Sequence, residues 1–208
     1  VLSNAIETKV GSITAEWEHF FNWLRADDEK EKIDREAIKQ QGTSLEGVSA
    51  GLFPRQRLLD YVETFIVYYK ETQKIIAQNH QFIGVNKAIE RFARRGELKG
   101  KLGVFWHTQG SGKSFSMIFY ARKIFRRLTG NFTFVVVSDR DDLDGQIYRN
   151  FLNTETVTPA DAAQPKNGEE LRQYLGQNKR LVFTLIQKFR WPAGQRYPVL
   201  STRDDIIV

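Results

Sequence analysis

The chain has 208 residues, of which 41% are hydrophobic and 27% are charged, so it can bury the core of one large domain or of one and a half. It contains no cysteine, which excludes disulfides and thiolate metal sites and fits the cytoplasm. No apolar run is long enough to cross a bilayer, and the first residues lack the pattern of a signal peptide, so we expect no contact with a membrane.

The formal net charge of +6 is unevenly distributed along the chain. Residues 1–53 hold 6 basic and 10 acidic side chains, and residues 54–208 hold the remaining 25 basic and 15 acidic ones. The second part therefore carries a net charge of +10. Such a surplus predicts a polyanionic partner, with nucleic acid first, or else only a positively charged surface that keeps the protein soluble.

Residues 1–53 combine aromatic side chains with charged and flexible stretches. The aromatic and apolar residues gather in one short segment, and they are Trp17, Phe20, Phe21, Trp23 and Leu24. The charged run of residues 26–41 is typical of a solvated helix face or loop. The Gly- and Ser-rich residues 42–51 are typical of a linker. Because an aromatic segment stands near the start without an initiator Met, we expect the chain to begin inside a larger protein.

Two helical patterns follow. From Pro54, which suits a first helical position, a stripe at spacings of three and four predicts one helix through Leu58, Leu59, Val62, Phe65, Ile66 and Tyr69. A second stripe predicts another helix through Phe82, Val85, Ala88, Ile89 and Phe92.

The rest of the chain alternates between predicted strands and helices. Residues 102–106 are predicted to form a first strand, and residues 112–128 a helix. Apolar runs at residues 132–137 and 181–185 predict strands buried on both faces, and a fourth strand begins at Ile206. Residues 154–167 are a long connection of uncertain structure. The order predicts an α/β fold in which helices flank a parallel sheet.

The most specific motif is the Gly-rich turn between the first predicted strand and its helix. Residues 103–114 read GVFWHTQGSGKS. Gly110 and Gly112 let the backbone approach phosphate groups closely, and the N–H groups that open the helix form an anion site. We expect Lys113 to reach the β- and γ-phosphates of ATP and the Ser114 hydroxyl to ligate Mg²⁺.

This motif departs from the full phosphate-loop pattern at one position. The pattern G-x-x-x-x-G-K-[ST] would have Gly where this chain has His107. The remaining G-x-G-K-S core resembles the loop of helicases and translocases, which do not require the first Gly. The alternative is a Gly-rich turn that binds nothing.

Three further segments carry polar residues at positions suited to ligands. VVVSDRDDLDGQI follows the second predicted strand, FTLIQKF ends the third, and Gln81 precedes the phosphate loop by 29 residues. Taken alone, the first is most simply a strand end whose acids cap the next helix, and the second a strand that leads into a loop. Gln81 suits an adenine-reading position, but a single Gln-Phe pair is a weak signal.

Together these segments resemble a known family. The chain is similar to the restriction (motor) subunit of type I restriction-modification enzymes in five segments. In chain order they are NHQFIGVNKAIE, GVFWHTQGSGKS, VVVSDRDDLDGQI, FTLIQKF and YPVLSTRDDIIV. The early segment IETKVGSITAEWEHF resembles the stretch that leaves the nuclease domain in that family. The resemblance covers nearly the whole chain and implies a superfamily 2 DNA translocase with a nuclease domain in front.

The resemblance implies a role for each matching residue. The expected ATP and Mg²⁺ site comprises Gln81, Thr108, Gln109, Gly110, Ser111, Gly112, Lys113 and Ser114, with Gln81 reading the adenine, Lys113 catalytic and Ser114 holding Mg²⁺. The expected contacts with a DNA strand come from Arg140, Thr184, Gln187 and Lys188.

The same resemblance implies an organisation and a set of partners. Residues 1–53 would lead from an upstream nuclease domain, and residues 54–208 would form the first RecA-like lobe, ending before the family's acidic DEAH-type box. The partners would be double-stranded DNA, held by its backbone, and the modification (methyltransferase) and specificity subunits. We expect this chain alone to bind ATP weakly at most, and neither to move along DNA nor to cut it.

Two other hypotheses remain open from the residues. One is a complete P-loop kinase or nucleotide-modifying protein, with Asp139 as its acidic residue, although no substrate or lid segment is recognisable. The other is a non-enzymatic nucleic-acid-binding module with a vestigial loop, against which the intact Lys113 and Ser114 argue.

Overall fold

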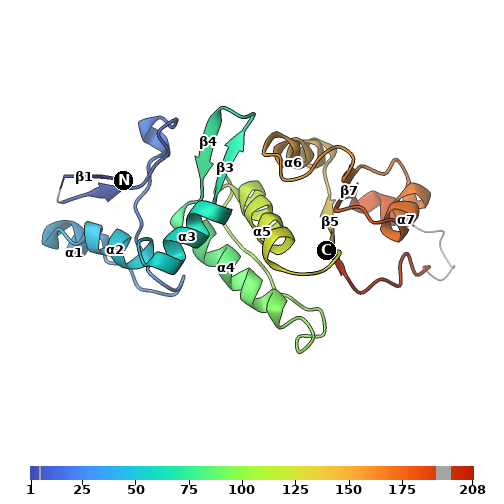
Figure 1. Ribbon diagram of the computed structural model, residues 1–208, viewed down its shortest axis with the longest axis horizontal. Helices are drawn as coiled ribbons and strands as arrows, with labels where there is room; N and C mark the ends of the chain where they lie inside the picture. The colour runs from blue at the N-terminus through green and yellow to red at the C-terminus, as the bar shows by residue number, and fades with distance from the viewer. Residues whose placement is uncertain (5, 191–197) are drawn as a thin grey trace. The chain divides into compact units, whose positions relative to one another are not determined.

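The computed structural model describes residues 1–4, 6–190 and 198–208 (Figure 1). Tyr197, the first residue of the last motif quoted above, lies outside the described residues. The chain forms two compact units, Val1–Lys123 and Ile124–Val208. Within the described part of the chain, no helix is long and apolar enough to cross a membrane.

The first unit opens with short elements. These are the antiparallel strands β1 (Leu2–Ser3) and β2 (Thr8–Lys9), the 3₁₀ turn η1 (Trp17–His19), α1 (Arg35–Gln41) and α2 (Ser44–Gly51). Asp34 caps α1, because its carboxylate accepts a hydrogen bond from the Ala37 N–H at 2.9 Å. None of residues 26–41 is buried, so the prediction of a solvated run is confirmed.

Residues 42–51 are largely helical, so their prediction as a linker is wrong. Gly42, at φ +66°, ends α1, and α2 begins two residues later. Val48 on α2 is fully buried, and the Ser44 hydroxyl donates to the Ile6 carbonyl oxygen at 3.0 Å. A Cβ on Gly51 would lie 2.3 Å from Trp23 Nε1. The small residues of α2 therefore allow close packing, and the segment folds against its neighbours.

The predicted helix after Pro54 is interrupted. Helix α3 (Arg55–Thr64) is followed by β3 (Ile66–Tyr69), which pairs antiparallel with β4 (Gln73–Ile76). The prediction is wrong beyond residue 64, because the aromatic and β-branched residues of β3 favour a strand once β4 supplies a partner. The predicted stripe is also misplaced on α3, whose outward side chains are Leu58, Leu59 and Val62, at 39%, 59% and 57% exposure.

An aromatic cluster forms the core of the first unit. Trp23, Tyr61 and Phe82 lie against one another with ring centroids 5.5–5.7 Å apart. Phe65 contacts Phe82 at 4.8 Å and Phe119 at 5.5 Å. The cluster joins the N-terminal segment to α3, to α4 (Asn79–Ala93) and to α5 (Lys113–Arg127) (Figure 1).

The two helices that flank the phosphate-loop motif agree with the sequence predictions. On α4, Phe82, Val85 and Phe92 are buried, and α5 begins and ends within a residue of its predicted bounds. Of the predicted inward residues of α5, the fully buried ones are Ile118, Phe119 and Ile124.

Residues 102–106 form no strand, and that prediction is wrong. Gly103 has φ +128°, which interrupts an extended strand, and Arg91 Nε donates to the Leu102 carbonyl oxygen at 3.0 Å. Val104 and Trp106 are 93% and 78% exposed. An apolar run becomes a strand only where a neighbouring strand pairs with its backbone, and this segment has no such neighbour among the described residues.

The second unit contains a parallel sheet in the order β6-β7-β5-β8. Its strands are β5 (Thr133–Ser138), β6 (Ala162–Ala163), β7 (Leu181–Leu185) and β8 (Ile206–Ile207). The strands predicted at 132–137, at 181–185 and from residue 206 are confirmed. β6 lies in the long connection for which the sequence predicted no structure.

Helices cover both faces of this sheet (Figure 1). Leu171 and Leu175 of α7 (Gly168–Gly176) pack with Val182 of β7. The next residue of that strand, Phe183, points to the opposite face and contacts Tyr148 and Phe151 of α6 (Asp141–Asn153) at 5.3 and 5.4 Å. The predicted α/β class, with a parallel sheet flanked by helices, is confirmed.

Candidate functional site

The Gly-rich motif forms a tight turn that leads into α5. Gly110 and Gly112 have φ of +79° and +76°, a region that favours glycine. Ser111 donates its N–H and its hydroxyl to the Thr108 carbonyl oxygen, at 3.3 and 2.7 Å. Thr108, Gln109 and Gly110 are exposed at the tip of the turn. The structure thus folds residues 108–114 into one closed turn, and its role in phosphate binding stays a prediction.

Lys113, the first residue of α5, folds back over this turn. Its Nζ donates to the carbonyl oxygens of His107 and Thr108, at 2.7 and 2.9 Å. Ser114 follows in the first helical turn, which contains no acidic residue. An ammonium group, a hydroxyl and the N–H groups at a helix start together fit a polyphosphate. Phosphate oxygens would compete with the two carbonyls for Lys113.

The start of α4 contacts the turn and the residues that lead into it. Gln81 Nε2 donates to the Gly112 carbonyl oxygen at 2.9 Å, and His80 Nε2 lies 3.1 Å from the Ser111 carbonyl oxygen. A Cβ on Gly84 would lie 2.6 Å from the Phe105 ring, so Gly84 lets α4 approach the chain that enters the turn. Helix α4 therefore supports the turn of residues 108–114.

Gln81 has partners inside the protein that sequence reasoning did not foresee. It is 4% exposed, and its Oε1 accepts the Gln78 N–H at 2.8 Å as part of a capping box. With Nε2 donating to Gly112, the side chain holds the helix start and the loop together. Its adenine-reading role stays a prediction.

His107 occupies the position where the full loop pattern has Gly. Its ring lies 4.6 Å from that of His80 and 4.4 Å from that of Phe105. Burial, and then the nearby His80 and Lys113, lower the pKa of His107, so its imidazole is neutral at neutral pH. Sequence reasoning did not foresee that His80 and His107 lie together beside the turn, and the departure from Gly was the signal that could have found His107.

Alanine substitutions at Gly110 and Gly112 distinguish two effects on stability, which are strain in the backbone and steric crowding of the new Cβ. Alanine at either site adopts a left-handed conformation that costs roughly 1–2 kcal/mol. At Gly110 a Cβ would meet no atom of the described residues within 4 Å, whereas at Gly112 it would lie 2.8 Å from Gln81 Nε2. We expect Gly112→Ala to lower the free energy of unfolding more than Gly110→Ala, as measured by denaturant titration.

The control for this comparison removes the crowded side chain. In a Gln81→Ala background the two glycine variants should cost the same, because only the backbone strain remains. Equal costs in the original background would contradict the close contact between Gln81 and the loop.

The polar residues predicted to contact DNA lie at the carboxyl ends of β5 and β7. Gln187 Nε2 donates to the Asp139 carbonyl oxygen at 2.9 Å, which joins the two predicted motif segments. Arg140 is exposed and forms an ion pair with Asp142 at 2.6 Å. Lys188 Nζ donates to the Pro165 carbonyl oxygen.

Thr184 does not join this cluster. It is fully buried in β7, and its hydroxyl has no hydrogen-bond partner among the residues that the structure describes. The prediction that Thr184 touches a DNA strand therefore needs correction, because its position within the sheet points the side chain into the core. Asp144, which belongs to the segment expected to lie along the DNA strand, is also buried, and it accepts hydrogen bonds from Ser138 and Gln164 at 3.3 and 3.0 Å.

The described residues contain no group of three or more His, Asp or Glu side chains that could hold a metal ion. The Ser114 hydroxyl is the one metal ligand that the sequence predicted in this chain, so a metal at the loop would be held by this hydroxyl and by the phosphate oxygens of the nucleotide.

Comparison with known proteins identifies the family. Residues 80–208, which include both the loop and the parallel sheet, match the family described as SWI2/SNF2 ATPase, and the chain belongs to that family. It is more particularly a homologue of type I restriction enzyme endonuclease subunits, which confirms the resemblance seen in the sequence.

Two relatives match over the whole chain. It is 38% identical to the type I restriction enzyme HindI endonuclease subunit of Haemophilus influenzae and covers 20% of that protein. It is 34% identical to the putative type I restriction enzyme MjaIXP endonuclease subunit of Methanocaldococcus jannaschii and covers 21% of it. The chain therefore spans about a fifth of the length of these relatives.

Proposed function

We propose that this chain is the part of an ATP-dependent DNA-translocating and DNA-cleaving subunit that holds the phosphates of ATP. The observation that carries the proposal is the closed turn of residues 107–114 at the start of α5, with Lys113 folded over it. Membership of an ATPase family supports ATP as the nucleotide. The homologous relatives are endonuclease subunits of type I restriction enzymes, which supports defence against foreign DNA as the role.

Each loop residue has a proposed task. Lys113 exchanges its carbonyl partners for the β- and γ-phosphates, and Gly110 and Gly112 let the backbone N–H groups face them. The Ser114 hydroxyl is the group that would hold Mg²⁺. Mg²⁺ neutralises charge on the phosphate oxygens when bound.

The strand-end cluster is proposed to contact the backbone of one DNA strand. Arg140 and Gln187 are exposed there, and Lys188 adds a positive charge. The surplus of basic over acidic residues after residue 53 supports a polyanionic partner. Backbone contacts position a protein on DNA without reading sequence, so we propose that a separate specificity subunit selects the target, alongside a modification subunit.

The domain organisation is proposed on the same grounds. Residues 54–208 would belong to the first RecA-like lobe of the motor, with the DEAH-type carboxylates supplied by further sequence, and residues 1–53 would connect it to a nuclease domain. The proposed location is the cytoplasm.

ATP turnover by the full-length protein, with and without duplex DNA, tests the proposal. We expect Mg²⁺-dependent hydrolysis that rises with duplexes of unrelated sequence to a similar extent. Transfer of phosphate to a small acceptor would identify a kinase instead, and turnover unaffected by DNA would contradict the motor function.

A further inference from the structure

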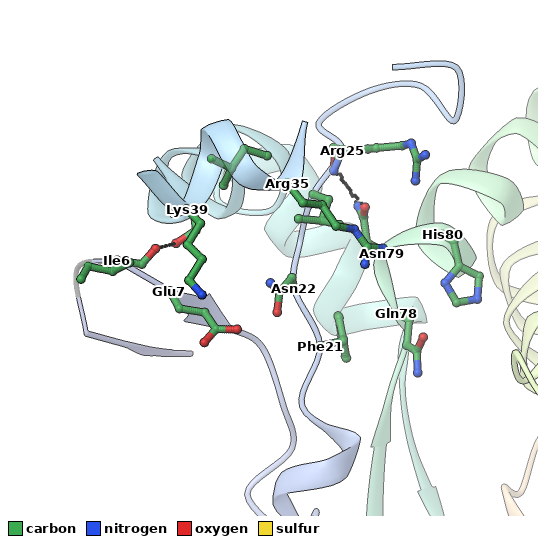
Figure 2. Close-up of a pocket in the computed structure, with 13 residues that line it drawn as sticks. Ile6, Glu7, Phe21, Asn22, Arg25, Arg35, Lys39, Gln78, Asn79 and His80 are labelled. Carbon is green, nitrogen blue, oxygen red and sulfur yellow. Dashed lines mark hydrogen bonds between the residues drawn. The ribbon is translucent and has the colours of Figure 1, made fainter. Parts of the chain in front are cut away.

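A cavity lies in the first unit, and its lining residue His80 also contacts the turn of residues 108–114. It has a volume of about 490 Å³, within the range of small-molecule sites, and none of residues 107–114 lines it. Its walls come from the N-terminal segment, from α1, and from the start of α4 (Figure 2). Neither the proposed nucleotide site nor the DNA contacts use this cavity.

The charge of the lining favours an anion. Arg25, Arg35 and Lys39 contribute three cations, against the single carboxylate of Glu7. Glu7 already has a partner, because its carboxylate lies 3.7 Å from Lys9 Nζ. Lys39 and Arg35 stand four residues apart on α1 and so share one helix face. In the part of the chain that the structure describes, neither of these two side chains has a hydrogen-bond or ion-pair partner.

Arg25 is held in place by α4. Asn79, which is 6% exposed, accepts the Arg25 N–H at 3.0 Å and donates to the Arg25 carbonyl oxygen at 2.9 Å. This paired contact fixes the backbone of Arg25 at the cavity wall, as Figure 2 shows. The backbone that carries Arg25 is therefore held in place, whereas the side chains of Arg35 and Lys39 can turn toward a ligand.

Apolar side chains complete the cavity beside the cations. They are Ile6, Phe21, Leu24 and Ile38. A wall with an aromatic ring next to positive charge suits a nucleotide unit, whose base is flat and apolar on its faces and whose phosphate is anionic. We propose that this cavity binds a phosphate-bearing ligand of nucleotide size, either free or as one unit of a nucleic acid strand.

Calorimetric titration of the full chain carrying Lys113→Ala tests this proposal, because that substitution disables the phosphate loop. The probes are AMP, inorganic phosphate and 5′-phosphorylated oligothymidylate. We expect saturable binding, weakened at least tenfold when Arg35→Ala and Lys39→Ala are added. The tightest of the three probes identifies the source of the phosphate group.

A matched control removes the same charge outside the cavity. Lys30 and Lys32 are exposed on the same charged run and do not line it, so Lys30→Ala with Lys32→Ala should leave binding unchanged. Equal weakening by both double variants, or no binding once Lys113 is replaced, would overturn the proposal. A different result would contradict the proposed ATP site in the loop, namely ATP binding that does not depend on Lys113.

Discussion

Trp23→Ala is expected to lower the free energy of unfolding by about 3–5 kcal/mol, the usual cost of removing a large buried aromatic side chain. Trp23 is 1% exposed and contacts the rings of Tyr61 and Phe82. Because it joins the N-terminal segment to α3 and α4, its loss leaves a cavity in the core of the first unit. Denaturant unfolding followed by circular dichroism measures the effect.

Trp17 supplies the matched control for this substitution. It is 60% exposed and stacks on Phe20 at 5.3 Å, outside the aromatic core. Trp17→Ala should cost about 0.5 kcal/mol, as is usual at a surface position. Similar losses for the two tryptophans would contradict the placement of Trp23 in the core.

Lys113→Ala is expected to lower the rate of ATP hydrolysis by the full-length protein at least about 100-fold, as losing one preorganised charged donor does in other enzymes. Lys113 is exposed, and its ammonium donates to the carbonyl oxygens of His107 and Thr108, so the substitution should leave the fold intact. Steady-state hydrolysis with saturating duplex DNA is the measurement.

Lys101→Ala is the control, since this exposed lysine precedes the loop and its side chain has no partner among the described residues. Its hydrolysis rate should stay within twofold of the unaltered protein. A Lys113→Ala protein that hydrolyses ATP at a similar rate would remove the chemical basis for the proposed motor.

The sheet of the second unit could be predicted because its strands are buried on both faces. Residues 133–138 and 181–185 are near-continuous apolar runs. Short runs of this kind are typical of parallel strands that are buried on both faces of a sheet. Strand β6 could not be predicted, because two alanines carry no pattern and pair only where β7 is already present.

The first unit shows where local patterns fail. The apolar residues 66–69 fit the pattern of a helix as well as that of a strand. They form a strand because β4 pairs with their backbone. Residues 102–106 have the composition of a strand but no neighbour to pair with among the described residues. The Gly- and Ser-rich residues of α2 form a helix because Val48 is buried, which composition alone does not reveal.

The candidate site was predictable where a motif fixes local geometry. The spacing of Gly110, Gly112 and Lys113 requires a turn before a helix, and the structure has one. The contacts of His80 with the turn and the burial of Thr184 depend on elements distant in sequence, so no local pattern could indicate them.

The most direct test of the ATP-phosphate site is a titration of a fluorescent ATP analogue with Mg²⁺ into this chain. In a chain that carries Arg35→Ala and Lys39→Ala, which removes binding at the separate cavity, the account predicts weak, saturable binding that is lost when Lys113→Ala is added and retained when Lys101→Ala is added. Equal binding by both variants, with matching circular dichroism spectra, would contradict it, because the nucleotide would then lie away from the turn of residues 107–114.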